Sequence, residues 1–430
     1  MLERLFKLSE HGTSVRTELI AGVTTFLTMS YIIFVNPDIL STTGMDRNAV
    51  FVATCLAAAL GSIVMGFVAN WPIGMAPGMG LNAFFAFTVV SALGFTWQQA
   101  LGAVFISGCI FVLLTVTGVR SWLIAGIPHS LRSAIAAGIG LFLAIIALKS
   151  AGIVVANKAT LVGLGDLKQT GPLLAILGFF IIATLDALKV RGSILIGILA
   201  VTVLSWIFGV SQFHGIVSAP PSIMPTFLQL DIVGALHGGL VHIILVFVLV
   251  EVFDATGTLI GIAKRANLIQ EGKPNRLSRA LLADSAAIVA GSLMGTSSTT
   301  AFVESASGVQ AGGRTGLTAI TIAALFIAAL FFSPLAASVP AYATAPALLY
   351  VAGLMMRELT EIEWDDLTEA APAAITALAM PFTYSIANGL AFGFITYVAV
   401  KIFTGRWSML HPATQIVAAL FVVRFAFFAD

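Results

Sequence analysis

Long runs of apolar residues, separated by short polar turns, follow one another along almost the whole chain. A membrane-spanning helix needs about 20 such residues, and the runs predict fourteen spans in two sets of seven. The first set of predicted spans covers residues 18–36, 49–69, 76–92, 98–118, 132–149, 172–189 and 193–210. A proline-containing link, 211–232, precedes the second set, which covers residues 235–262, 280–296, 300–312, 315–334, 341–356, 370–387 and 388–404. We leave open whether the last apolar run, 413–428, crosses the membrane or lies in its interface.

One stretch, residues 291–319, departs from this apolar pattern. It reads GSLMGTSSTTAFVESASGVQAGGRTGLTA and places hydroxyl groups, glycines and the carboxylate of Glu304 at membrane depth. A charge at the centre of a membrane helix costs roughly 2.5–3.5 kcal/mol or more. Broken backbone at this depth is tolerated where it lines a cavity or is buried in protein. The stretch therefore predicts a discontinuous span that faces a small polar ligand.

The two halves of the chain resemble each other around this feature. The segment 58–66, AALGSIVMG, matches 289–295, VAGSLMG, when one gap is allowed. A break rich in glycine, proline or hydroxyl residues follows each match, at 73–82 and at 296–313. Repeats of seven spans must enter the membrane from opposite sides, because seven is odd. Paired interruptions at corresponding positions of inverted repeats indicate the binding site of a transporter.

Composition and charge agree with a polytopic membrane protein. The chain is 59% hydrophobic and 10% charged, whereas a soluble domain has about 25% charged residues. The net charge of +1 gives no reason to expect a nucleic acid partner. All but four of the 21 lysines and arginines fall on one predicted side of the membrane; the four exceptions are Arg47, Lys149, Lys158 and Lys168. The positive-inside rule therefore places both termini in the cytoplasm.

Polar residues in the predicted spans are the candidates for chemistry. Asp254 lies in the eighth span with Thr258 one turn beyond it, and Glu251, three residues earlier, shares the same helix face. Asp284 lies near the start of the ninth span on a helix with a ridge of small residues, and Asn82 is the first-half counterpart of Glu304. We expect these groups to bind a ligand or to carry a proton.

Each candidate also has a structural interpretation. A buried acid such as Asp254 can simply bond to a backbone carbonyl, and Asp284 can pair with Arg276 or Arg279. The aromatic rings of Phe84 and Phe302 are placed to lie over a flat ligand, or else to fill the core. The acidic run 358–369 is typical of a solvated cytoplasmic linker.

Motifs for catalysis are not found in the sequence. There is no phosphate-binding glycine loop with lysine, no His-Glu-x-x-His pair and no Gly-x-Ser-x-Gly elbow. We therefore expect no enzyme activity, no metal and no cofactor, and any work done by the protein would draw on an ion gradient.

Several segments resemble one transporter family closely. These segments are HGTSVRTELIAGVTTFLTMSYIIFVNPDIL near the start, GMGLNAFFAF at 78–87, VFDATGTLIG at 252–261, GTSSTTAFVESASGVQAGGRTGLTA at 295–319, and the late EWDDLTEAAPAAIT and MPFTYSIANGLAFG. They resemble the AzgA-like branch of the nucleobase–cation symporter (nucleobase–ascorbate transporter) family, and the resemblance covers nearly the whole chain.

The resemblance implies a fold and a mechanism. It implies an all-α protein with two inverted seven-span repeats and short extended segments in spans 3 and 10. Residues 1–131 and 234–336 would form a core domain, and residues 132–233 and 337–430 a gate domain. It also implies a homodimer in the bacterial plasma membrane whose core moves like an elevator while carrying adenine, guanine or hypoxanthine with protons.

The resemblance also assigns roles to residues. The family's acid of the eighth span falls on Asp254, its base-binding carboxylate of the tenth on Glu304, its ninth-span aspartate on Asp284 and its polar residue of the third span on Asn82. From their positions in the sequence, we expect Phe84, Phe302 and Thr258 to complete the substrate site. Asp254, Glu304 and Asp284 would be the candidates for proton coupling, since a buried carboxyl group can take up a proton.

Three other interpretations stay open. An inorganic-anion exchanger of the same architecture would need a cationic site at the breaks, where this chain has acids. A facilitative uniporter or channel would not need the buried acids. An intramembrane enzyme would need a catalytic pair.

Overall fold

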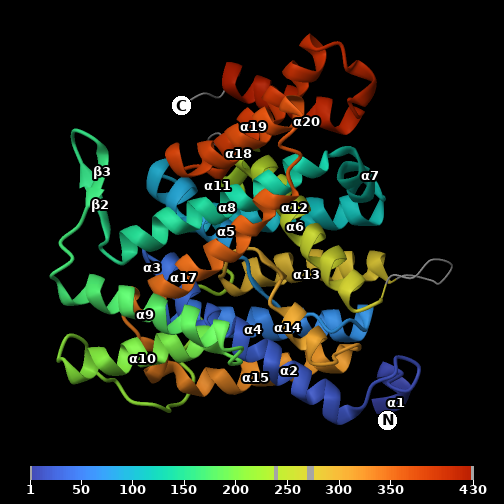
Figure 1. Ribbon diagram of the computed structural model, residues 1–430. Coiled ribbons are helices and arrows are strands. Elements are labelled where there is room, and N and C mark those ends of the chain that lie inside the picture. Colours follow the sequence, from blue (N-terminus) through green and yellow to red (C-terminus); the bar gives the residue numbers. More distant parts are fainter. Residues whose placement is uncertain (1, 237–240, 269–275, 428–430) are drawn as a thin grey trace.

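Apolar helices that run side by side make up most of the molecule, as the computed structural model shows (Figure 1). The structure describes residues 2–236, 241–268 and 276–427; within them, nothing is described of the side chains of Ser121, Val241, His242, Phe253, Asp254 and Thr256. The first half contains α1 (Leu2–Phe6), α2 (Val15–Met29), α3 (Ile32–Ser41), α4 (Arg47–Val64), η1 (Met65–Ala69), β1 (Met75–Pro77), α5 (Met79–Ala83), η2 (Phe84–Ala92), α6 (Trp97–Val116), α7 (Val119–Gly126), α8 (His129–Ser150), β2 (Val154–Asn157), β3 (Leu161–Leu164), α9 (Thr170–Ala187) and α10 (Ser193–Ile207).

The second half begins after the link that follows α10. It contains α11 (Ile232–Leu236), α12 (Val241–Arg265), α13 (Leu277–Met294), β4 (Thr299–Ala301), α14 (Ser305–Gln310), α15 (Gly316–Ala329), η3 (Leu330–Phe332), α16 (Ser333–Ala337), α17 (Ala341–Met355), η4 (Met356–Glu361), α18 (Leu367–Phe382), α19 (Ile386–Phe403), η5 (Trp407–Met409) and α20 (Pro412–Phe427). Within the described residues, nine helical stretches are long and apolar enough to cross a membrane. The expected all-α membrane architecture is confirmed.

The two predicted breaks meet in a short antiparallel sheet. β1 pairs with β4 so that Met75 lies opposite Ala301 and Pro77 opposite Thr299. The pairing continues beyond the strands, because Gly78 donates its amide hydrogen to the Ser298 carbonyl at 2.9 Å. The interrupted spans 3 and 10 thus satisfy each other's backbone hydrogen bonds, as buried backbone requires.

The sequence match between the halves has a structural cause. In each half the matched glycine lies where a strand crosses a helix: a Cβ on Gly61 would be 2.8 Å from the Cβ of Met75, and one on Gly291 would be 2.4 Å from Thr299 Oγ1. A side chain at either position would push β1 or β4 away from its helix. The matched segments therefore play the same part in the two halves.

The structure also contains elements that the apolar pattern did not predict. The first predicted span is divided into α2 and α3 at residues 30–31. A short helix, α7, follows α6, and the link between α8 and α9 contains the β2–β3 hairpin, which projects from the body of the molecule (Figure 1). α20 is a helix of 16 residues, which corresponds to about 24 Å; it packs on α19 and α7.

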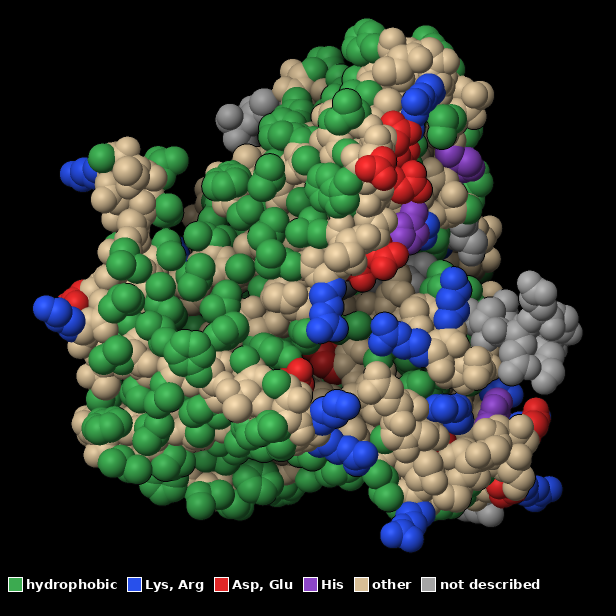
Figure 2. Space-filling model, viewed as in Figure 1, with side chains coloured by type: hydrophobic (Ala, Val, Ile, Leu, Met, Phe, Trp, Pro, Cys, Tyr) green, Lys and Arg blue, Asp and Glu red, His purple; other side chains and the backbone are tan. Residues whose placement is uncertain are grey.

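Charged side chains are distributed unevenly over the surface. In the view of Figure 2, apolar side chains cover much of the left and centre, whereas Lys and Arg gather on the right, on the side of α1 and the end of α12. The cytoplasmic location of the termini stays a prediction.

Two groups of helices pack mainly among themselves. In one group α4 contacts α3, α13 and α15, and α2 contacts α14 and α15. In the other, α8 contacts α17, α18 and α19, and α17 contacts α9 and α10. The division into core and gate domains at residues 131, 233 and 336 stays a prediction.

Candidate functional site

Asn82 lies at the point where the two interrupted spans meet. It belongs to α5, just after β1, and is fully buried. Its side-chain oxygen accepts a hydrogen bond from Ser297, which lies just before β4. Its amide nitrogen has no hydrogen-bond partner among the described residues. Because a side-chain amide nitrogen carries two hydrogens, Asn82 has donors available for a ligand.

Glu304 lies on the other side of the β1–β4 pair, immediately before α14. Tyr31, located between α2 and α3, donates its hydroxyl hydrogen to Glu304 Oε1 at 2.6 Å. The buried ring of Phe302 lies 6.4 Å from the Tyr31 ring, tilted by 44°. Glu304 itself is partly exposed. A carboxylate, a phenol and an aromatic face thus lie together at the second break, although the sequence had not pointed to Tyr31.

Asp284 is held in a buried ion pair. Its Oδ2 lies 3.2 Å from the Arg120 guanidinium, and both side chains are fully buried. Its Oδ1 accepts hydrogen bonds from the Thr300 hydroxyl at 3.0 Å and from the Ala301 amide at 3.3 Å. Asp284 therefore anchors β4 to α13, and its charge is compensated.

The partner of Asp284 differs from the expected one. Arg276 and Arg279 lie close to Asp284 in the sequence, but Arg120 of α7 forms the ion pair. The guanidinium of Arg120 also lies over the Phe111 ring, 4.0 Å from its centroid. The side chain of Arg120 reaches into the protein interior, and the cytoplasmic location of its segment stays a prediction.

Glu251 is a second buried acid near the breaks, on α12, and it is 1% exposed. Ser107 of α6 lies 3.2 Å from Glu251 Oε1. Ser298, in the second break, also interacts with this carboxyl group but does not reach hydrogen-bond geometry. The side chain of Asp254, one turn further along α12, lies outside the described residues, so its role stays a prediction.

The two remaining predicted site residues, Phe84 and Thr258, lie packed within the protein. Phe84 is buried and packs edge-to-face against Phe247, with ring centroids 5.0 Å apart. Thr258 is half-buried on α12. Whether Phe84 or Thr258 contacts a ligand stays a prediction.

Two further buried polar residues tie the first span to the breaks. The Asn36 amide donates to Thr54 Oγ1 at 2.7 Å and to Thr296 Oγ1 at 2.9 Å, and thereby joins α3, α4 and the second break. Glu18 in α2 accepts from the amide of Arg314 at 2.8 Å and from the Thr318 hydroxyl at 2.6 Å, at the start of α15. A carboxylate is favourable at a helix N-terminus. The sequence could have pointed to Asn36 and Glu18, because each is a polar residue inside a predicted apolar span.

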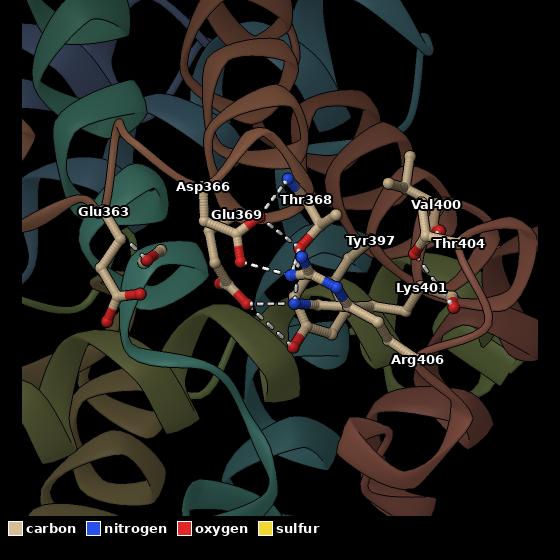
Figure 3. A network of polar contacts seen from close by, with 10 residues as sticks. Glu363, Asp366, Thr368, Glu369, Tyr397, Val400, Lys401, Thr404 and Arg406 are labelled. Carbon is tan, nitrogen blue, oxygen red and sulfur yellow. Dashed lines mark hydrogen bonds and ion pairs between the residues drawn. The ribbon is translucent and has the colours of Figure 1, made fainter.

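A polar network joins α18 to α19 at some distance along the chain from this site (Figure 3). The fully buried Lys401 lies 2.8 Å from Glu369 Oε1 and donates to Thr368 Oγ1 at 2.7 Å. Arg406 pairs with Asp366, which caps α18. Hydrogen bonds from the Thr368 amide and hydroxyl lower the pKa of Asp366 to about 2.

This network corrects one expectation about the same region. The run 358–369 is exposed at several positions, but the interpretation as a solvated linker is wrong for Glu369, which is 8% exposed. Lys401, which lies near the end of the predicted span 388–404, is buried as well.

The site is closed in this conformation. Asn82, Ser297 and Ser298 have no exposed surface. A ligand can therefore reach the Asn82 amide only after part of the protein moves.

Comparisons with known proteins give the family of the chain. Residues 16–424 match a model described as a permease family. The chain is 53% identical to the adenine permease AdeP of Escherichia coli K12 over 99% of this chain and 96% of that protein. It is 44% identical to the guanine/hypoxanthine permease PbuO of Bacillus subtilis 168 over 98% of this chain and 99% of that protein.

Solved structures show the same fold at low sequence identity. The transmembrane domain of the cyanobacterial bicarbonate transporter BicA superposes with a TM-score of 0.65 at 16% identity, covering 88% of this chain and 97% of that domain. The anion transporter Slc26a9 of the mouse also has a TM-score of 0.65, at 10% identity, covering 90% of this chain and 68% of that protein. This is the fold of two inverted seven-span repeats that the sequence predicted. The chain therefore belongs to this permease family, the nucleobase–ascorbate transporter family, and is related within it to the AzgA-like purine permeases.

Proposed function

We propose that this permease imports purine nucleobases, namely adenine, guanine or hypoxanthine, together with protons. The observation that carries the proposal is the meeting of the two breaks, where the Asn82 amide nitrogen has no hydrogen-bond partner among the described residues and Glu304, a partly exposed residue, presents a carboxylate. A purine presents N–H donors and ring-nitrogen acceptors on its edges and a flat face to Phe302. Two relatives described above, an adenine permease and a guanine/hypoxanthine permease, support the same substrate class.

Such a site would select its substrate through hydrogen bonds. A site built to bond a ligand group rejects an analogue lacking that group by a factor of about 10⁴–10⁵, because buried polar groups are then left unpaired. The test is uptake of labelled adenine, guanine, hypoxanthine and uracil by cells that lack their own purine permeases. We expect saturable uptake of at least one purine and weak uptake of uracil; no purine uptake by correctly inserted protein would overturn the proposal.

Proton coupling is proposed from the carboxyl groups at and near the breaks and from the absence of an ATP-binding motif in the sequence. Asp254, Glu304 and Asp284 are the residues that the sequence nominates for this step. Addition of purine to sealed vesicles should drive proton entry, and Asp254→Asn should abolish uptake while the protein still inserts. Uptake that is unaffected by a protonophore and by external pH would instead indicate a facilitative uniporter.

Elevator movement of the core domain against the gate domain is proposed for the transport step. α5, which carries Asn82, touches α8 of the proposed gate domain, and a Cβ on Gly80 would lie only 2.7 Å from Ile139 Cγ2. A close contact in which one partner, Gly80, has no side chain suits two surfaces that slide past each other. A homodimer that holds the gate domains fixed in the bacterial plasma membrane is part of the same proposal, and chemical crosslinking in membranes would test it.

The anion-exchanger alternative rests on the shared fold with BicA. An anion site at the breaks would need a cation to compensate the charge of the ligand. The buried cation Arg120 is already paired with Asp284, which accepts hydrogen bonds from Thr300 and Ala301 of the second break. We therefore expect that bicarbonate neither competes with purine uptake nor is transported.

A further inference from the structure

We infer that Asn36 is a positioning residue of the substrate site, which acts on the purine through the Asn82 amide. Asn36 holds Thr296 of the second break, and the next residue, Ser297, bonds to Asn82. The inference rests on the proposed function, because Asn82 is the group that would bind the purine.

The first observation is that the hydrogen bonds of the Asn36 side chain allow it one orientation. Asn36 is fully buried, and its amide nitrogen lies 2.7 Å from Thr54 Oγ1 and 2.9 Å from Thr296 Oγ1. Thr54 directs its own hydrogen to the Val50 carbonyl at 2.6 Å. Because a hydroxyl has one hydrogen, the Thr54 oxygen can then only accept. The nitrogen of Asn36 must therefore face Thr54, and its two hydrogens meet the two threonines.

This orientation leaves the Asn36 side-chain oxygen without a hydrogen-bond partner among the described residues. A buried acceptor in that state is destabilising, and a leucine of similar shape would carry no such cost. The cost is offset by the bonds of the nitrogen, of which the one to Thr296 reaches the second break.

The second observation is a closed ring of hydrogen bonds directly after Thr296. The Ser297 hydroxyl donates to the Asn82 side chain, and the Ser298 carbonyl accepts from the Gly78 amide at 2.9 Å. The Gly78 carbonyl in turn accepts from the backbone amide of Asn82 at 2.9 Å. Both the side chain and the backbone of Asn82 are thus attached to the second break, so that a shift of the break moves both.

The third observation is that Asn36 anchors this part of the break to two continuous helices. Residues 295–298 lie between α13 and β4 and belong to neither element. The Thr296 amide donates to the Gly291 carbonyl of α13 at 3.0 Å, and the Thr296 hydroxyl is held to α3 and α4 through Asn36. Without the Asn36 bond the break would keep its tie to α13 and lose its tie to the first span. The Asn82 amide would then lose its fixed position.

The test is equilibrium binding of labelled adenine, guanine and hypoxanthine to purified protein. Thr296→Val removes the acceptor at nearly the same size, and we expect purine affinity to fall roughly two- to tenfold, which is the worth of one neutral hydrogen bond. Asn36→Leu should cause a similar or larger loss. Thr202→Val is the matched control, because Thr202 is a buried threonine that bonds to the Ile198 carbonyl of its own helix, α10; this variant should bind purines like the unmodified protein.

A second readout separates positioning from a general loss of stability. If Thr296 acts through Asn82, Thr296→Val should cause no further loss of purine affinity in the Asn82→Ala background, since coupled residues have non-additive effects. Equal losses with and without the Asn82 side chain would overturn the inference. If Asn82→Ala binds too weakly to measure, the ratio of adenine to hypoxanthine affinity decides, because these bases differ in the donors and acceptors that they offer to an amide. Thr296→Val should change this ratio, and an unchanged ratio would overturn the inference.

The outcomes also separate the inference from the proposed function. Thr296→Val protein that binds all three purines like the unmodified protein would overturn the inference alone. Unmodified protein that binds none of the three would overturn the proposed function as well. If Asn36→Leu does not insert, Thr296→Val carries the test, because it removes one hydrogen bond of Asn36 and keeps the other.

Discussion

Tyr31 donates its hydroxyl hydrogen to Glu304 across 2.6 Å, although 273 residues separate the two in the sequence. The bond joins the gap between α2 and α3 to the break that precedes α14. It orients one oxygen of the Glu304 carboxylate. The first span therefore contributes to the site through a phenol.

Tyr31→Phe should weaken purine binding without preventing insertion. The variant loses a hydrogen bond to a charged group, worth roughly 1.5–3 kcal/mol to the protein, and a Glu304 carboxylate that is no longer oriented should bind purine more weakly. The measurement is equilibrium binding of labelled purine to the purified variant. Tyr350→Phe is the matched control, because Tyr350 also donates to a carboxylate, that of Asp186, but on the surface between α17 and α9. Equal affinity of the two variants would contradict a role for the Tyr31–Glu304 bond.

The glycines that underlie the two strands should tolerate no side chain. Gly61→Ala and Gly291→Ala would place a Cβ within 2.8 and 2.4 Å of strand atoms, and overpacking of this kind costs about 1–3 kcal/mol. Both variants should unfold at lower temperature in detergent. Gly353→Ala in α17, where a Cβ would meet nothing within 4 Å, should keep or gain stability. Similar melting temperatures for all three would show that the strand crossings are not tight.

The buried lysine of the α18–α19 network should matter for stability rather than for substrate choice. Lys401→Met leaves Glu369 without its cation, and breaking a buried ion pair from one side costs about 3–5 kcal/mol. We expect a lower melting temperature and an unchanged ranking of competing purines. The double variant Lys401→Met, Glu369→Gln should recover part of the loss, and a double variant less stable than the single one would argue against the pair.

Gly80→Val should slow transport more than binding. Its side chain would meet Ile139 where α5 touches α8, and a barrier higher by about 1.4 kcal/mol slows a step tenfold. The measurement is the rate of purine exchange across proteoliposomes, compared with purine affinity in detergent. Unchanged exchange would show that this contact does not slide.

Much of the fold could be predicted because lipid imposes a simple rule on the sequence. Each span needs about 20 apolar residues. Clusters of glycine, proline and hydroxyl-bearing residues mark the places where a span is interrupted. For this reason the breaks at 73–82 and 296–313 could be found before the strands β1 and β4 were known. The same reasoning located Asn82 and Glu304.

Pairing between distant residues could not be predicted in this way. The register of β1 with β4 and the bond of Tyr31 to Glu304 depend on how helices pack, which no local pattern encodes. The ion pair of Asp284 is a further case: the sequence offered Arg276 and Arg279 as neighbours, yet the partner is Arg120, 164 residues away. The strands of the β2–β3 hairpin have four residues each, too short for a clear alternation.

The central claim is that the Glu304 carboxylate accepts hydrogen bonds from the edge of a purine and thereby distinguishes one base from another. Glu304→Gln keeps one acceptor and introduces an amide donor at nearly the same size. If the carboxylate accepts N–H groups of the base, the loss of affinity should differ among adenine, guanine and hypoxanthine, because they present different hydrogens. If Glu304 only carries a proton, binding should keep its ranking while accumulation is lost.

The most direct measurement is therefore competition binding of the three purines to purified Glu304→Gln protein, with Asn82→Ala measured in parallel. We predict losses of about ten- to more than a hundred-fold that differ among the bases and change their ranking. An unchanged ranking at unchanged affinity would contradict the assignment and remove Glu304 from the binding site.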